Sequence, residues 1–151
     1  MKWIEKRTIR TNVKVENWQD AVKKSGDLLV SGEFVDPRYI QAMIETTIEL
    51  GPYCVIAPGI AIPHARPEMG VIETGFSAIT LADPVEFGNH DNDPVFLVLA
   101  FCALDHDSHI NILKLMARAI SREGFIKRVK QAVDEDELEK ILNFPGDDDS
   151  F

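Results

Sequence analysis

The sequence predicts a single three-layer α/β domain, with helices on both sides of one sheet. Stretches with apolar residues at a spacing of three or four alternate along the chain with short apolar or β-branched stretches, as helices alternate with strands. Residues 95–103 are apolar throughout, which is typical of a central strand covered on both faces. A chain of 151 residues can bury a full core. We therefore assign residues 1–145 to one domain and the acidic segment 146–151 to a disordered tail.

The first third of the chain is predicted to form a strand and two helices. The strand covers residues 9–15, where β-branched residues are frequent. The first helix ends before Gly32. Its inner face comprises Trp18, Val22, Ser25 and Leu29. The second helix has Asp36 as its N-cap and Pro37 at its first position, and it stops at Gly51.

The middle of the chain is predicted to be mostly extended. Residues 53–57 form a strand, Pro58-Gly59 forms a turn, and a short extended segment then leads to His64. Residues 75–81 form another strand, which ends in a turn at Asp83-Pro84.

Three helices are predicted after the apolar run at 95–103. Asp107 or Ser108 is expected to cap the first of them. Ser121 is expected to cap the second, and Asp134 the third.

His64 is the candidate nucleophile. Pro63 and Pro67 restrict the backbone on either side of it, and Gly59 allows a sharp change of direction before it. A histidine on so stiff a segment loses little freedom when it reacts. An imidazole that attacks phosphorus forms a phosphoramidate, and Arg66 is close enough in sequence to stabilise the charge of the transferred group. The alternative is an ordinary histidine, buried in the core or exposed in a loop.

A second histidine, His109, opens the helix after the longest apolar strand. Ligands of open α/β sheets gather at the carboxyl ends of strands, and a helix N-terminus attracts anions. His109 is therefore a candidate neighbour of a phosphoryl group, and the alternative is a side chain that merely faces solvent beside the helix cap. His90 lies in a loop rich in Gly, Asn and Asp and is predicted to be exposed.

The same residues allow a rival interpretation as a zinc hydrolase. His64, His106 and His109 could form a three-histidine zinc site. Asp105 or Asp107 would then orient these ligands. The sequence contains no Walker loop, no G-x-G-x-x-G and no G-x-S-x-G motif, so it shows no means of holding a nucleotide. A phosphoryl group would have to arrive from another protein.

The composition limits the cellular compartments and the classes of binding partner to be expected. The formal net charge of −9 argues against nucleic acid and against anionic membrane surfaces. Cys54 and Cys102 lie in apolar runs and are expected to be buried rather than to form a disulfide framework, as in a reducing cytoplasm. No signal peptide and no apolar stretch long enough to cross a bilayer is recognised.

Two motifs in this order carry a family resemblance: Gly59-Ile-Ala-Ile-Pro-His64, and Ser108-His109-Ile110 at a helix start. They resemble the enzyme IIA domains of the bacterial phosphotransferase system, in the mannitol/fructose class (type 2). Within that class the chain is most similar to the ascorbate-specific IIA proteins, over roughly residues 5–143. The matching blocks are Trp18-Gln-Asp-Ala-Val22, Val35-Asp-Pro-Arg-Tyr39, Gly51-Pro-Tyr53, Ala57-Pro-Gly59, Pro63-His-Ala-Arg-Pro-Glu68, Gly75-Phe76 and Asp91-Asn-Asp-Pro-Val95.

The resemblance implies a mixed, mainly parallel sheet with helices on both faces. It also implies that His64 accepts a phosphoryl group from phosphorylated HPr and passes it to a cysteine of the cognate enzyme IIB, which works with the membrane component IIC. In this family Nε2 is the expected nucleophile, Nδ1–H is donated to a backbone carbonyl, and the second histidine, here His109, helps to stabilise the phosphoryl group. Transfer requires no metal and no cofactor. The implied sugar is L-ascorbate, and the alternative is a regulatory protein of the same fold whose phosphorylation controls a partner.

The chain departs from the family pattern at one place. Mannitol-type members carry an arginine on the helix before the active histidine, whereas this chain has Glu45 and Glu49 in that region. Arg66 or Arg38 is the candidate replacement.

Overall fold

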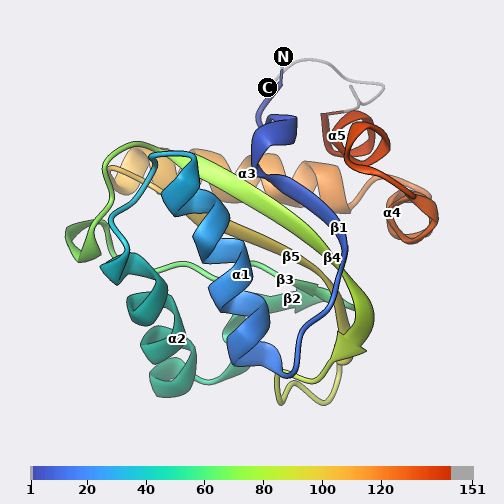
Figure 1. Cartoon of the computed structure of the whole chain (residues 1–151), viewed down its shortest axis with the longest axis horizontal. Coiled ribbons are helices and arrows are strands. Elements are labelled where there is room, and N and C mark those ends of the chain that lie inside the picture. The colour runs from blue at the N-terminus through green and yellow to red at the C-terminus, as the bar shows by residue number, and fades with distance from the viewer. Residues whose placement is uncertain (1, 144–151) are drawn as a thin grey trace.

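A computed structural model describes residues 2–143, which form one five-stranded sheet with helices packed on it (Figure 1). The order of the strands across the sheet is β1-β4-β5-β3-β2. The strands are β1 (Ile9–Val13), β2 (Val55–Ala57), β3 (Ile60–Ala61), β4 (Gly75–Val85) and β5 (Val95–Cys102). The helices are α1 (Trp18–Ser31), α2 (Arg38–Leu50), α3 (His106–Ile120), α4 (Phe125–Gln131) and α5 (Glu135–Asn143). The tail predicted at residues 146–151 lies outside the described residues.

Two apolar clusters, one on each face of the sheet, form the core. One cluster joins the sheet to α1 and α2 and contains Leu29 and Met43, whereas the other joins it to α3, α4 and α5 and contains Met116 and Leu138. Figure 1 shows α1 and α2 in front of the sheet and α3 behind it. Every residue of β5 is buried, as expected of the middle strand of the sheet. The predicted three-layer α/β architecture is confirmed.

The sheet is mixed, but its pairings are evenly divided rather than mainly parallel. β1 pairs with β4 and β3 pairs with β5 in parallel, whereas β2–β3 and β4–β5 are antiparallel. The connections explain the difference. β2 and β3 are joined by the turn at Pro58-Gly59, and β4 and β5 by the loop 86–94, and strands joined so briefly pair antiparallel.

Several element boundaries differ from the sequence prediction in the first half of the chain. The Asp36 side chain does not cap α2: its carboxylate lies 3.7 Å from the Arg38 guanidinium, and only its backbone oxygen accepts a hydrogen bond, from the Tyr39 N–H. Tyr53 belongs to a 3-10 turn rather than to a strand. β4 continues through the predicted turn at Asp83-Pro84, because a register shift against β5 bends the strand without ending it.

The N-caps predicted for the helices in the second half of the chain are only partly correct. Asp105, not Asp107 or Ser108, caps α3 by accepting the Ser108 N–H at 2.8 Å. Ser121 ends α3 instead of starting the next helix, which begins after Gly124. The predicted cap at Asp134 is confirmed, since its carboxylate accepts the Glu137 N–H at 2.9 Å.

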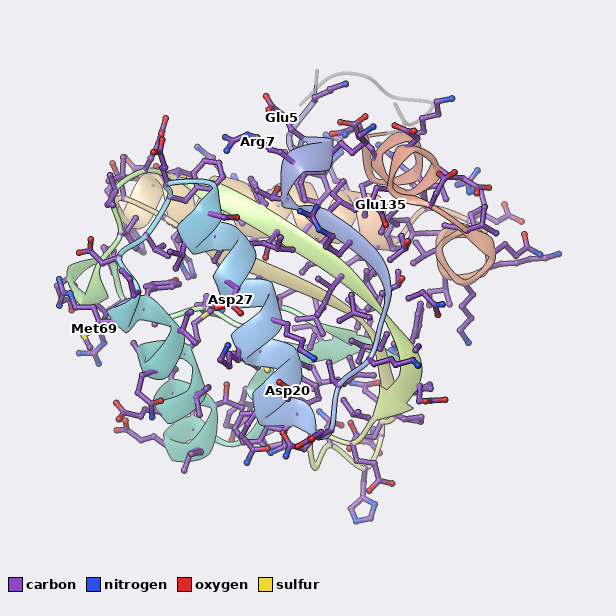
Figure 2. The ribbon with its side chains drawn as sticks, viewed as in Figure 1. Glu5, Arg7, Asp20, Asp27, Met69 and Glu135 are labelled. Atoms are coloured by element: carbon purple, nitrogen blue, oxygen red, sulfur yellow. The ribbon has the colours of Figure 1, made fainter. Side chains whose placement is uncertain are left out.

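The last helix is fastened to the edge of the sheet opposite β2. Glu135, labelled in Figure 2, accepts hydrogen bonds from the N–H (2.9 Å) and the hydroxyl (2.5 Å) of Thr11 on β1.

The two cysteines differ in burial. Cys102 is buried as expected, whereas Cys54 is only partly buried.

Candidate functional site

His64 lies just beyond the carboxyl end of β3, beside the carboxyl end of the parallel strand β5. β3 and β5 run side by side with Ala61 opposite Val98, and the same register three residues further on brings His64 to Phe101. The Phe101 N–H donates to the Pro63 oxygen at 3.2 Å, which extends the pairing beyond the end of β3. The pairing of the strands therefore places the imidazole at the carboxyl end of the central strand.

The imidazole of His64 is held by one stacking contact and one hydrogen bond. Its ring lies on the ring of Phe101, with centroids 4.4 Å apart and planes inclined by 24°. Nδ1 lies 2.8 Å from the Ile62 oxygen. Because a carbonyl oxygen only accepts, Nδ1 carries the hydrogen and Nε2 is left with its lone pair. Nε2 has no hydrogen-bond partner among the described residues, and it is not among their buried unpaired atoms.

His109 completes an aromatic cluster with these two rings. It lies in the first turn of α3, which Asp105 caps, and its ring centroid is 5.3 Å from that of His64 and 5.5 Å from that of Phe101. Both histidines are partly buried. The structure thus brings together the two histidines selected from the sequence, one at the end of β3 and one at the start of the helix that follows β5.

A groove of about 440 Å³ opens beside the two histidines. One wall comes from the second half of α2, including Glu45, Thr46 and Glu49. The other side includes Arg66 and Met69, and Figure 2 places Met69 near the start of α2. Among the residues that line the groove, Arg66 carries the only full positive charge, and its side chain is exposed.

The surroundings of His64 favour its neutral form. Burial lowers the pKa of His64 below its ordinary value of 6.5, and the nearby His109 lowers it further, whereas the hydrogen bond to Ile62 acts in the opposite direction. The imidazole is therefore unprotonated near neutral pH, and an unprotonated Nε2 is the form that can act as a nucleophile.

Tyr39 also belongs to the site, although the sequence analysis did not select it. Its ring is fully buried in the cluster beneath α1 and α2. Its hydroxyl accepts the Ala65 N–H at 2.9 Å and lies 2.9 Å from the Phe101 oxygen, to which it donates. The available signal was the position of a tyrosine on the buried face of a helix, because a buried phenol requires a hydrogen-bond partner.

The other candidate residues lie away from the pair. Arg38 is not among the residues that line the groove, and its side chain pairs with Asp36 on the surface. His90 is exposed, as predicted, and so is His106. Within residues 2–143 no group of three His, Cys, Asp or Glu side chains has an arrangement that could hold a metal ion, so the geometry gives no support to the zinc site. No helix in that range combines the length and the apolar character needed to cross a bilayer.

Fold and site together define a component of a phosphotransferase. Residues 2–144 match the family described as "Phosphoenolpyruvate-dependent sugar phosphotransferase system, EIIA 2", and the chain belongs to this family. It is 45% identical over 123 residues to the ascorbate-specific PTS system EIIA component of Escherichia coli strain K12, a match that covers 80% of each chain.

Solved structures agree with this assignment. A putative PTS IIA (PtxA) from Streptococcus mutans superposes with a TM-score of 0.82 at 34% identity, over 91% of this chain and 88% of that one. The complex of enzyme IIAMTL with phosphorylated enzyme IIBMTL from Escherichia coli contains a chain that matches with a TM-score of 0.81 at 27% identity, over 92% of this chain and 96% of that one. The IIA family inferred from the sequence motifs is therefore confirmed.

Proposed function

We propose that this protein carries a phosphoryl group on Nε2 of His64, which it receives from phosphorylated HPr and delivers to a cysteine of enzyme IIB in a system for L-ascorbate. The observation that carries the proposal is the hydrogen bond from Nδ1–H to the Ile62 oxygen, because it leaves the Nε2 lone pair available beside an open groove. Membership of the EIIA family and the complex of a related IIA with phosphorylated IIB support the direction of transfer.

The proposed reaction consists of two displacements at phosphorus. In the first, the Nε2 lone pair forms a bond to phosphorus while the bond from phosphorus to its donor breaks, and the donor keeps that electron pair. In the second, the cysteine thiolate sulfur attacks phosphorus, the P–Nε2 bond breaks, and Nε2 recovers its lone pair. Such transfer needs positioning and charge stabilisation from the protein more than further covalent chemistry.

Three groups are assigned to the charge of the transferred phosphoryl group. His109 lies beside the His64 ring, the first turn of α3 offers its N-terminal N–H groups, and Arg66 lines the same groove. Glu45 and Glu49 line the groove on α2, the helix where the family resemblance implies an arginine in mannitol-type relatives. Arg66 is therefore the proposed substitute for that arginine, and no metal or cofactor is assigned a part.

The first test is phosphorylation by isotopically labelled phospho-HPr. We expect a label on the protein that is labile in acid and stable in base, as a phosphoramidate is, and we expect His64→Ala to abolish it. His90→Ala is the matched control, because it removes an exposed histidine that does not line the groove and should leave labelling unchanged. Label that persists in His64→Ala would refute the site.

The second test addresses the acceptor and the sugar. The phosphorylated protein is mixed in turn with IIB domains of ascorbate, mannitol and fructose systems, and transfer to the ascorbate IIB is expected to be the fastest. His109→Ala should slow this step more than it slows acceptance from phospho-HPr. A phosphorylated protein that transfers to no IIB would instead favour the regulatory alternative. A cytoplasmic location belongs to the same proposal, because the proposed donor and acceptor meet the protein there.

A further inference from the structure

We propose that Tyr39 is the positioning residue for His64: its hydroxyl joins the backbone just after His64 to the end of β5 and thereby keeps the imidazole seated on Phe101. This inference rests on the proposed role of His64 as the phosphoryl carrier. It adds a residue that touches neither the phosphoryl group nor the reacting nitrogen and acts only through the loop that presents it.

The hydrogen bonds of the hydroxyl connect three parts of the chain. Tyr39 comes from α2, Ala65 follows His64 directly, and Phe101 is the residue of β5 on which the His64 ring stacks. The hydroxyl accepts the Ala65 N–H at 2.9 Å and donates to the Phe101 oxygen at 2.9 Å, with the Ala65 oxygen a more distant acceptor at 3.2 Å. One phenol thus fixes the distance between the loop and the strand beneath the ring.

The loop has few other means of being held. Pro63 and Pro67 provide no N–H, so the backbone on either side of His64 has a reduced supply of donors. Before His64 the pairing to β5 continues as far as the Pro63 oxygen, which accepts the Phe101 N–H. The Ala65 bond to Tyr39 is the corresponding attachment on the other side of the histidine.

Removal of the Tyr39 hydroxyl should therefore release the loop that carries His64, while the packing of the aromatic ring at position 39 stays intact. In Tyr39→Phe the Ala65 N–H and the Phe101 oxygen lose their shared partner in the interior, and buried unpaired groups of this kind drive local rearrangement. Burial raises the pKa of the Tyr39 hydroxyl, so the phenol keeps its proton and its two bonds at any pH at which the protein works.

The test compares Tyr39→Phe with two matched variants. Tyr53→Phe makes the same chemical change at a tyrosine that is 80% exposed. Ser77→Ala removes another buried hydroxyl, which donates to the Ser25 oxygen at 2.7 Å away from the groove. Single-turnover acceptance from phospho-HPr, normalised to the folded fraction, should fall about ten-fold or more in Tyr39→Phe, with an unchanged KM for the donor, and should stay at the wild-type rate in both controls.

Nitrogen NMR of the His64 ring gives a readout that a purely structural role would not change. In Tyr39→Phe the proportion of the Nδ1–H tautomer should decrease and the titration midpoint of His64 should rise toward 6.5, because the ring leaves its buried seat. Incorporation of 4-aminophenylalanine at position 39 restores the donor to the Phe101 oxygen and a weaker acceptor for the Ala65 N–H, and it should partly recover both the rate and the NMR signature.

Three outcomes would overturn the inference: a wild-type acceptance rate with a wild-type His64 titration in Tyr39→Phe, an equal loss in Ser77→Ala, or no rescue by the amino analogue. If Tyr39→Phe does not fold, rapid hydrogen exchange of the Ala65 amide in the wild-type protein would overturn it instead. A wild-type protein that phospho-HPr cannot label would refute the proposed function, and the tautomer measurement would still decide the role of Tyr39.

Discussion

At the scale of single residues, the imidazole of His64 is kept neutral and oriented by groups from three separate segments. Phe101 supports one face of the ring, the Ile62 oxygen fixes the position of its hydrogen, and His109 lies at its edge. Burial and the neighbouring imidazole both make protonation of His64 unfavourable. The proposed phosphoryl carrier is thus kept free, at neutral pH, of the proton that would block it.

The pH dependence of phosphorylation follows from the lowered pKa of His64. Since only the unprotonated ring accepts phosphorus, the acceptance rate should fall on acidification with a midpoint below the ordinary histidine value of 6.5. His109→Asn removes a neighbour that disfavours the charged form, so the midpoint should move upward. It should stay below 6.5, because burial is the larger cause. Ring-proton NMR titration of both proteins measures the two midpoints. A midpoint that moves downward in His109→Asn would contradict this account.

The sequence allowed part of this site to be predicted at residue scale. His64 stood out because prolines flank it, and His109 because it follows the apolar run at the start of a helix. The contacts of Phe101 and Tyr39 were not predictable in the same way. They depend on the register between β3 and β5 and on the seating of α2, which join residues far apart in the chain.

At the scale of elements, the turn between β2 and β3 directs the chain toward His64. Gly59 has a φ of 79°, in the region that favours glycine, and its N–H donates to the Asn92 oxygen. Its own oxygen accepts the N–H groups of Phe96 and Leu97. A Cβ on Gly59 would lie 2.4 Å from the Phe96 ring. The turn thus requires glycine for two independent reasons, its backbone conformation and the close approach of a buried ring.

Gly59→Ala is expected to lower stability by more than its backbone cost alone. The left-handed conformation costs about 1–2 kcal/mol for a residue with a side chain. The overlap with Phe96 should add about 1–3 kcal/mol. Gly124→Ala is the matched control, since Gly124 has a φ of 78° and a Cβ added there would meet open space. Urea unfolding of the two variants measures the difference, and equal losses would contradict the role assigned to Phe96.

Elements were easier to predict from the sequence than their ends. The helical spacing of apolar residues gave α1 and α2 nearly to their bounds, and the uninterrupted apolar run gave β5. The wrongly predicted ends lie where a local sequence signal conflicts with the structure that the rest of the chain imposes. Asp83-Pro84 is typical of a turn, yet the pairing of β4 with β5 carries the strand through it. Ser121 is typical of an N-cap, yet it ends the helix before it.

At the scale of the whole molecule, the site and the last helix occupy different parts of the sheet. His64 follows β3, whereas α5 packs against β1, and β4 and β5 lie between these two strands (Figure 1). The strands that support the site are held by the middle of the sheet. Leu138 shares an apolar cluster with Phe101, but β1 and β4 separate α5 from the strands that carry the site. Damage to the core beneath α5 should therefore weaken the fold without moving the imidazole.

Leu138→Ala tests this separation. Leu138 is fully buried beneath α5, and truncation of such a leucine costs about 2–5 kcal/mol. The free energy of unfolding should fall by that amount, while the His64 titration midpoint and the acceptance rate per folded molecule stay unchanged. Leu113→Ala, at a leucine that is 37% exposed on α3, should cost far less. A shifted His64 midpoint in Leu138→Ala would show that the two parts of the sheet are coupled.

The groove beside the histidines has one side that tolerates change and one that does not. Phe101 belongs to the fully buried central strand and packs in the cluster beneath α3, α4 and α5, so a substitution there disturbs that core. Glu45 and Glu49 are exposed in the second half of α2, where replacement of a side chain changes the stability of the fold little. Under the proposed function, selection for a new docking protein can therefore act on the charges of this helix while Nε2 of His64 stays where it is. Chemistry and partner choice can diverge independently within the same small protein.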